Sequence, residues 1–330
     1  MSNIETLKKI YFKAINAVKP QQVISQNISI DDKFIHIAKK KVALDSFKKL
    51  YIFGAGKASL GMAKECEKIL GKKIAGGVVV SNQNAKLKRV KHITSTHPLL
   101  SQKSVDSADE IISEMQKMSK EDMFIFLLSG GASAMIEKPI DGLTLKDFQK
   151  ISASLLTSGI DIKALNSVRK SISQIKGGKL AEHTTCKGVV LVLSDVIGND
   201  LQTIGSAPLF NGETPHYIIG DNALALSKAS KFIAPMVQKV KIVTTTLDMS
   251  SPKAATFISD KIKKYESKYE SYSLLFGAET TTKVKGSGLG GRNQELALRL
   301  LLKECINEKT AILCAGSDGI DGNSKATGAF

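Results

Sequence analysis

The chain has 330 residues, enough for one large hydrophobic core or two ordinary ones, and we expect two. Its composition, 42% hydrophobic and 24% charged, is typical of globular proteins, and its apolar runs are too short to span a membrane. The net charge of +16 comes from lysines spread along the whole chain. Because only 5% of the residues are aromatic and no nucleic-acid-binding spacing occurs, we expect no nucleic-acid partner.

The N-terminus and the cysteines favour a cytoplasmic protein. Residues 4–18 carry apolar side chains at helical spacing up to Pro20, which is not the pattern of an export signal. The four cysteines form neither a CxxC pair nor a disulfide-like series, which is typical of a reducing compartment.

Short apolar runs alternate with amphipathic segments, and this pattern predicts βαβ units around a mainly parallel sheet. The predicted strands are 50–53, 77–80, 92–95, 124–128, 189–193, 216–219, 241–245, 273–276 and 311–314. Besides the N-terminal helix, the predicted helices include 104–118, 147–156, 163–176 and 252–265. The fold class is therefore α/β, with a large Rossmann-like domain over residues 1–237 and a smaller α/β domain over 238–330.

Two glycine-containing turns follow predicted strands, and ligands of open α/β sheets bind at such strand ends. After strand 50–53 come Gly54, Gly56 and Lys57, in a spacing that is neither a Walker A loop nor a complete GxGxxG motif. A structural turn with a solvated lysine is the alternative. After strand 124–128, the segment Ser129, Gly130, Gly131 and Ser133 predicts a backbone nest for a phosphate or carboxylate, rather than a plain turn.

The predicted helix 163–176 carries a polar stripe, and a predicted strand further on ends in an acid. Asn166, Arg169 and Lys176 lie on one stripe that either supplies donors to an anion or is only a solvated face. Asp195 follows strand 189–193, where a carboxylate can meet Mg²⁺ or a substrate hydroxyl. Capping of a following helix is the alternative for Asp195.

The last two motifs lie in the C-terminal part of the chain. Gly290 and Gly291 precede Arg292 at a predicted helix start, which is unfavourable for the helix dipole and favours an anion or nucleotide site. Segment 316–322 contains Asp318 and Asp321 between glycines. These acids either hold Mg²⁺ or cap a glycine-rich turn.

Taken in this order, the motifs resemble class II glycerate kinases, which combine an N-terminal glycerate-kinase-type domain with a C-terminal MOFRL domain. The segments that carry the resemblance are GAGKAS (54–59), LSGGASA (128–134), NSVRKSIS (166–173), SDVIGND (194–200), GAETT (277–281), GSGLGGRNQELAL (286–298) and AGSDGIDG (315–322).

The resemblance implies an ATP-dependent, Mg²⁺-dependent kinase that converts D-glycerate to 2-phosphoglycerate in a cleft between the domains. It implies catalytic roles for Lys57, Asp195 and Arg292, and metal binding by Asp195 and Asp318. Substrate and nucleotide binding are implied for a larger set: Gly54, Gly56, Ser129, Gly130, Gly131, Ser133, Asn166, Arg169, Lys176, Glu279, Gly290, Gly291, Asn293 and Glu295. The expected partners are D-glycerate and ATP, without a membrane, and a homodimer is left open as the assembly.

Three departures from the family pattern stand out. Ala207 replaces the glycine of an SGP turn, and Ala278 replaces that of a GGE segment, so we expect a Cβ where the backbone needs φ > 0 or a close approach. The family also continues to a GPTGTN-like loop, and no such loop occurs before Phe330. We therefore expect the C-terminal domain to be incomplete.

Two alternatives to the kinase are kept. An NAD(P)H-dependent hydroxypyruvate reductase is disfavoured because strand 77–80 runs into Ser81, Asn82 and Gln83, without the acid that binds the ribose of NAD. A catalytically inactive binding protein for small anionic ligands is the other alternative.

Overall fold

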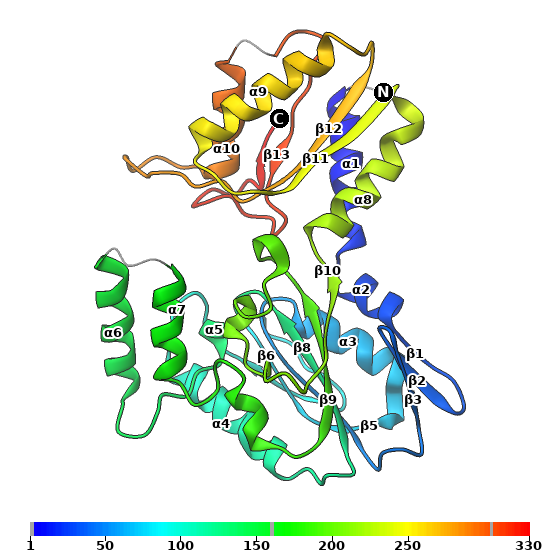
Figure 1. The fold of residues 1–330 in the computed structure, drawn as a ribbon, viewed down its shortest axis with the longest axis vertical. Coiled ribbons are helices and arrows are strands. Elements are labelled where there is room, and N and C mark those ends of the chain that lie inside the picture. Colours follow the sequence, from blue (N-terminus) through cyan, green and yellow to red (C-terminus); the bar gives the residue numbers. More distant parts are fainter. Residues whose placement is uncertain (1–2, 159–161, 304–305) are drawn as a thin grey trace. The chain divides into compact units, whose positions relative to one another are not determined.

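The computed structural model describes residues 3–158, 162–303 and 306–330, and its contacts divide the chain into two compact units (Figure 1). The larger unit is Lys19–Asp221. The smaller unit joins the described residues of Met1–Val18 to those of Asn222–Phe330. These limits differ from the sequence-based boundary at residues 237 and 238, because α1 (Asn3–Ala17) packs on α8 (Asn222–Ile233) and α8 packs on β11 (Lys239–Leu247).

A seven-stranded parallel sheet forms the centre of the larger unit and confirms the predicted α/β class. Its strand order is β10-β9-β8-β4-β6-β7, with β5 beside β4. The strands are β4 (Leu50–Ala55), β5 (Ile74–Gly76), β6 (Val78–Ser81), β7 (Lys91–Thr94), β8 (Met123–Ser129), β9 (Lys187–Leu193) and β10 (His216–Gly220). Every residue of β8 is buried, as expected of a central parallel strand.

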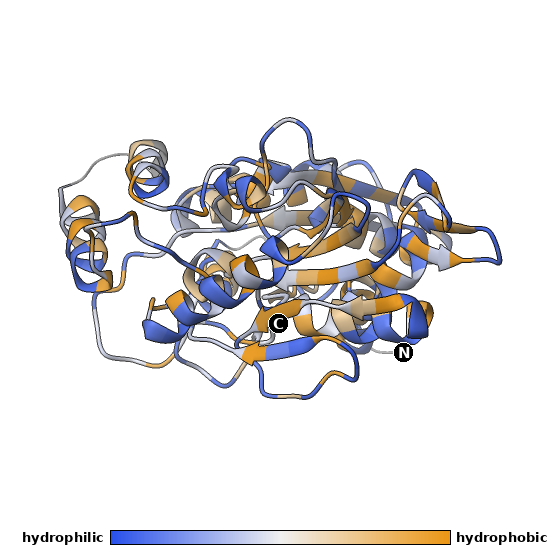
Figure 2. Cartoon of the chain, turned by 90° about the horizontal axis from the view of Figure 1, so that it is seen from below, coloured by the Kyte–Doolittle hydropathy of each residue, from blue (hydrophilic) through white to orange (hydrophobic). Residues whose placement is uncertain are grey.

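Helices cover both faces of this sheet. On one face, the core combines alternate residues of β4, β6, β8 and β9 with the apolar stripe of α4 (Gln102–Gln116). On the other face, α3 (Ser59–Leu70) contacts β4, β6 and β8, and α2 (Pro20–Asn27) packs on α3. The strands of the sheet carry long hydrophobic segments (Figure 2).

Local signals explain several helix starts. Ser101 and Ser104 form a capping box for α4, and Thr144 and Asp147 form one for α6 (Leu145–Thr157). Pro20 opens α2 at a position that needs no backbone donor. A three-stranded antiparallel sheet, which the sequence analysis did not predict, follows α2: β1 (Ile28–Ile30), β2 (Phe34–Ile37) and β3 (Lys40–Ala43).

The predicted helix 163–176 is wrong at its C-terminal end. Helix α7 is Ile162–Ser171, and Ser173 then forms an antiparallel bridge with Pro139. Lys179 Nζ donates to the carbonyls of Lys170 and Ser173, so a lysine side chain satisfies the end of the helix. Lys176 is therefore not on a helical stripe with Arg169.

In the smaller unit, β11 and β12 (Tyr272–Ala278) pair in parallel, and α9 (Ser251–Glu266) and α10 (Arg292–Leu301) share a core with them. The predicted strand 311–314 is wrong in extent and pairing. The strand is β13 (Cys314–Ala315), and it pairs antiparallel with β14 (Gly328–Ala329), because the chain between them folds back through a glycine-rich turn.

The remaining elements are short. Helix α5 (Ala132–Met135) follows β8, and 3-10 helices cover Gly71–Lys73, Lys179–His183, Ile197–Asn199, Ile204–Ser206 and Ala234–Met236. None of the helices in the described ranges is long and apolar enough to cross a membrane.

The strand order places a ligand-binding position between β4 and β8. After β4, the chain adds β6 and β7 on one side and then returns to place β8 and β9 on the other side. Ligands of open α/β sheets bind where the strand order reverses in this way, at the carboxyl ends of the strands.

Candidate functional site

The turns after β4 and β8 are joined at the reversal point of the sheet. The backbone N–H of Lys57 donates to the carbonyl of Gly130 at 2.9 Å, and the N–H of Ala58 donates to Ser129 Oγ at 3.0 Å. Gly56 has a φ of 129°, and a Cβ there would overlap Ser129. The contact between the two turns therefore depends on glycine at position 56.

Three side chains lie against the two glycines of the segment 130–133, which we call the 130–133 turn. A Cβ at Gly130 would overlap the carboxylate of Asp195, and a Cβ at Gly131 would lie 2.8 Å from His97 Cδ2 and 3.3 Å from Lys57 Cγ. The structure thus brings the predicted Lys57, Asp195, Gly130 and Gly131 together. It adds His97, which the sequence analysis did not select.

The charges around the 130–133 turn affect one another. Burial, and then the charge of Lys57, lower the pKa of His97, while the charge of Asp195 acts to raise it. Asp195 is exposed, and the residue that precedes the next 3-10 helix as its N-cap is Val196. The helix-capping alternative for Asp195 is therefore not supported. An ammonium, an imidazole and an accessible carboxylate share one position, a set that suits an anionic substrate and its hydroxyl.

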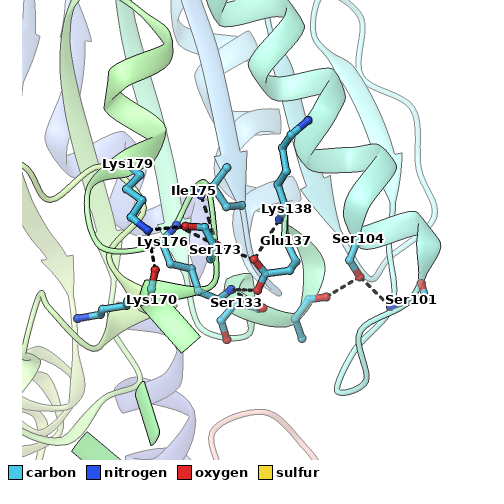
Figure 3. Close-up of polar contacts among 11 residues, drawn as sticks. Ser101, Ser104, Ser133, Glu137, Lys138, Lys170, Ser173, Ile175, Lys176 and Lys179 are labelled. Atoms are coloured by element: carbon cyan, nitrogen blue, oxygen red, sulfur yellow. Dashed lines mark hydrogen bonds and ion pairs between the residues drawn. The ribbon is translucent and has the colours of Figure 1, made fainter. Parts of the chain in front are cut away.

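A second set of polar residues in the larger unit lies after α5, in α7 and after α7, and Figure 3 shows Glu137 and Lys176 of this set. Lys176 pairs with Glu137 at an N···O distance of 2.7 Å, and the two side chains are only 3% and 0% exposed. Arg169 is partly buried, lies within electrostatic reach of Glu137, and its Nε has no hydrogen-bond partner among the described residues. Asn166 is partly buried one turn earlier in α7. Of these two cations, Lys176 has its partners within the described residues, whereas Arg169 keeps a donor without a hydrogen-bond partner there.

In the smaller unit, α10 begins at Arg292, as predicted, and Asp321 caps it, a role that the sequence analysis did not give to this acid. Asp321 is 2% exposed and accepts hydrogen bonds from the N–H groups of Asn293 (3.0 Å) and Gln294 (2.8 Å). A carboxylate at a helix N-terminus is electrostatically favourable. Asp321 therefore offsets the cost of placing Arg292 there, and Arg292 instead pairs with Glu279 at 2.9 Å.

The other predicted residues of the smaller unit lie in and beside this loop. Gly291 packs against Asp321, and Gly290 has a φ of 149°. Glu295 accepts from Arg299 Nε at 2.7 Å. Burial acts to raise the pKa of Glu295, but hydrogen bonds from Thr282 and Arg299 and the charge of Arg299 outweigh it and lower the pKa.

The carboxylates of the described residues can hold a magnesium ion only if water and substrate phosphates supply its other ligands. No group of three or more potential metal ligands occurs within the described ranges. Mg²⁺ usually keeps several waters and binds one or two carboxylates together with substrate phosphates. The exposed carboxylate of Asp195 meets this requirement. Asp318 is also exposed and receives a long hydrogen bond from the N–H of Ile320 (3.4 Å), within its own turn.

Two residues, His97 and Glu137, were not selected from the sequence, and a third, Asp321, was considered only as a metal ligand or as the cap of its own turn. His97 follows β7, so its position just after a predicted strand was a usable signal. Glu137 is an acid just after an apolar segment, and Asp321 precedes Gly322 in a recognised motif. The sequence does not reveal the partners of Glu137 and Asp321, because Lys176 and the start of α10 lie far from them along the chain.

The two alanine replacements behave differently. Ala207 has a φ of 56°, and its neighbour Ser206 has a φ of 62°, so this turn does require the left-handed conformation. Ala278 ends β12, where it pairs with Leu247 in an exposed position. The expected conflict is therefore present at Ala207, and Ala278 shows no positive φ.

Comparison with known proteins covers both units. Residues 6–241 match a family model described as a domain of unknown function (DUF4147), and residues 272–330 match the model of the MOFRL family. A D-glycerate 2-kinase from Thermotoga maritima is 31% identical, over 99% of this chain and 87% of the relative. A glycerate 2-kinase from Pyrococcus horikoshii is 29% identical, over 96% of this chain and 82% of the relative.

A solved structure is also similar to this chain along most of its length. The crystal structure of a glycerate kinase from Thermotoga maritima matches with a TM-score of 0.86 and 29% identity, over 98% of this chain and 85% of that chain. The similarity of sequence and of fold thus extends along nearly the whole chain.

Proposed function

The chain belongs to the glycerate 2-kinase family, and we propose that it is a kinase that transfers a phosphoryl group from ATP to the 2-hydroxyl of D-glycerate. The products would be 2-phosphoglycerate and ADP. The relatives named above support glycerate as the substrate. ATP as the donor, the 2-hydroxyl as the acceptor and Mg²⁺ as the metal are our own assignments.

The observation that carries this proposal is the group of side chains on the 130–133 turn. Phosphoryl transfer needs little covalent chemistry from the protein and depends on positioning and on stabilisation of charge. Lys57 provides a cation and Asp195 an accessible carboxylate, at the position where a parallel sheet binds ligands.

We assign a role to each group of the larger unit. Lys57 stabilises the negative charge of the transferring phosphoryl group. Asp195 contacts the reacting hydroxyl and accepts its proton, while the hydroxyl oxygen forms the new bond to phosphorus and the bond to the leaving ADP breaks. In the alternative role Asp195 would hold Mg²⁺, and the proton would pass to an oxygen of the transferred phosphoryl group and from there to solvent. When bound, Mg²⁺ would neutralise charge on the phosphates. Arg169, whose Nε has no hydrogen-bond partner among the described residues, binds the carboxylate of D-glycerate.

The smaller unit contributes groups for an anion in this proposal. Arg292 is half exposed in its pair with Glu279, so its guanidinium can exchange that partner for a phosphate. Gly290, Gly291, Asn293 and Glu295 would shape the same loop around a nucleotide. Asp318, exposed in its turn, is the proposed second metal ligand.

An assay with purified protein, ATP, Mg²⁺ and D-glycerate tests the proposal. We expect ADP release that depends on D-glycerate, and loss of at least about 100-fold in kcat for Lys57→Ala or Asp195→Ala, because each removes charge stabilisation in the transition state. Variants within a few-fold of wild type would contradict the assigned roles.

The same preparation distinguishes the alternatives. If no ADP forms and hydroxypyruvate is consumed with NAD(P)H, the protein is a reductase. If D-glycerate binds tightly without turnover in either assay, it is a binding protein. A cytoplasmic location and a homodimer are further proposals, which fractionation and light scattering test.

A further inference from the structure

Helix α5, which begins within the 130–133 turn at Ala132, is too short to satisfy its own carbonyls. The last carbonyls of any helix lack partners within it, and α5 has only 4 residues. Side chains from other segments take over: Ser104 Oγ donates to the carbonyl of Ala134 at 2.7 Å, and Ser95 Oγ donates to that of Met135 at 2.8 Å. Hydrogen bonds from other segments of the chain therefore fix the position of α5.

The third carbonyl of this series, that of Ser133, receives its hydrogen bond from a charged group. Lys176 Nζ donates to it at 3.1 Å and pairs with Glu137 at 2.7 Å (Figure 3). The side chains of Lys176 and Glu137 are 3% and 0% exposed. Lys176 is thus enclosed by protein, and its ammonium is directed at the backbone of the 130–133 turn.

Glu137 in turn holds the segment that carries Lys176. Ser173 Oγ donates to Glu137 Oε1 at 2.6 Å and accepts from the N–H groups of Ile175 and Lys176, each at 3.3 Å. The N–H of Lys138 also donates to Glu137 Oε1 at 3.0 Å. One carboxylate therefore connects the end of α5 with the segment that follows α7.

Stability alone does not explain a buried ion pair. Removing two charges from water is costly, and well-packed apolar residues of similar size stabilise a fold equally well or better. What an apolar pair cannot supply is a directed donor for the Ser133 carbonyl. The pair provides that donor and keeps it in one orientation.

We propose that Glu137 and Lys176 are positioning residues, whose buried ion pair fixes the Ser133 carbonyl and thereby the 130–133 turn. The proposal rests on the kinase function for its effect on catalysis, since the side chains of Lys57 and Asp195 lie against the glycines of this turn. It assigns Lys176 no contact with the substrate, because the enclosed ammonium already has Glu137 and Ser133 as partners.

The test replaces the pair without leaving a lone buried charge. In Glu137→Gln/Lys176→Met, the amide keeps an oxygen for Ser173, and methionine matches the length of the lysine stem. We expect the melting temperature to stay within about 5 °C of wild type. We expect kcat to fall at least about 30-fold, with a smaller change in the KM for D-glycerate, because the reacting groups lose alignment.

A matched control carries the same chemical changes at a neighbouring exposed pair. Asp109 and Lys138 form an ion pair with side chains 49% and 31% exposed. Asp109→Asn/Lys138→Met should keep wild-type kcat. A folded Glu137→Gln/Lys176→Met variant with wild-type kcat and KM would overturn the proposal, because the pair would then be only structural.

Amide hydrogen exchange separates this proposal from the proposed function. In the double variant, exchange across residues 129–135 should be at least about 10-fold faster than in wild type and in the control, whatever reaction the protein catalyses. Unchanged exchange there would overturn the positioning role, whereas a wild-type protein that does not phosphorylate D-glycerate would overturn only the function. If the double variant does not fold, Lys176→Arg, which keeps the ion pair but alters the donor, gives the same comparison.

Discussion

The two glycine-rich loops of this chain use their glycines differently. In the larger unit, a Cβ at Gly130 or Gly131 would meet the side chains of Asp195 or His97. In the smaller unit, Gly286 and Gly288 have no atom of the described residues, other than their chain neighbours, within 4 Å of where a Cβ would lie. In the loop of the larger unit, glycine is required for the close approach of other side chains. At the start of the loop of the smaller unit, glycine has no such role.

This difference shows where each loop is fixed. The 130–133 turn is held by the backbone N–H of Lys57, which donates to the Gly130 carbonyl, and by the buried pair of Glu137 and Lys176. In the loop of the smaller unit, Asn323 forms hydrogen bonds with the Gly288 carbonyl (3.2 Å) and the Gly290 N–H (2.9 Å), and Gly291 packs against Asp321. The turn of the larger unit is thus packed at both of its glycines, whereas the loop of the smaller unit leaves open space at its first glycine, Gly286.

The largest expected effect is on catalysis by Gly130→Ala. The added methyl group would displace the carboxylate of Asp195, an exposed side chain that can move aside at little cost to the fold. We expect kcat to fall at least about 100-fold, or about 2.7 kcal/mol of transition-state stabilisation, with a small change in the melting temperature. Steady-state kinetics with D-glycerate and ATP measures this effect.

Gly286→Ala is the matched control, since its methyl group would enter open space. Its kcat should remain within about 3-fold of wild type. If both variants lost the same activity, or neither lost any, the contrast between the two loops would not hold.

The next effect concerns the stability of the smaller unit. Asp321→Ala removes a buried carboxylate that accepts from the start of α10, and we expect a loss of about 2–3 kcal/mol in the free energy of unfolding. Asp318→Ala, at an exposed position, should change it by less than about 0.5 kcal/mol. Urea denaturation measures both. Equal losses would show that Asp321 is not the cap of α10.

A pH effect distinguishes the units, because all five histidines lie in the larger one. Burial lowers the pKa of His92 and of His216 below the ordinary value of 6.5. The unfolded chain therefore binds these protons at a higher pH than the folded protein, and the free energy of unfolding decreases as the pH falls below about 6.5.

His216→Gln should make this decrease smaller, since it removes one proton that only the unfolded chain takes up readily. Urea denaturation at pH 7.5 and at lower pH gives both slopes. An identical slope in the variant would mean that His216 is not responsible for the effect.

The smallest expected effect is at Ala207, the one turn where an alanine occupies a glycine conformation of the family pattern. A φ of 56° costs an alanine roughly 1 kcal/mol. Ala207→Gly relieves that cost, but it also loses a buried methyl group and loosens the unfolded chain. We expect a net change within about 0.5 kcal/mol. A gain above about 1.5 kcal/mol would show that strain dominates there.

Much of the fold could be predicted because its signals are local. Buried strands such as β8 and β9 read as apolar runs, and the turns that follow them carry the site residues. The helix 163–176 was extended too far because its apolar spacing continues to Ile175, although a tertiary contact of Ser173 ends the helix earlier. The short sheet β1–β3 has too few residues per strand to show a period.

The site could be predicted only in part, for a related reason. Glycines and charges after strands were visible, and Lys57, Gly130 and Asp195 do meet. The partners that fix them were not visible, because Glu137 and Lys176 are 39 residues apart by number and meet only in the fold. Arg292 at a helix start gave a signal of function, yet its electrostatic cost is offset by Asp321, which follows much later in the sequence.

The central claim is that this chain phosphorylates D-glycerate at the 2-hydroxyl. The direct measurement is phosphorus NMR of the product formed from D-glycerate and ATP with Mg²⁺. We expect one new phosphomonoester signal, coupled to the single proton on C2, at the position of authentic 2-phosphoglycerate. A product that coincides with 3-phosphoglycerate, or no product with a folded protein, would contradict it.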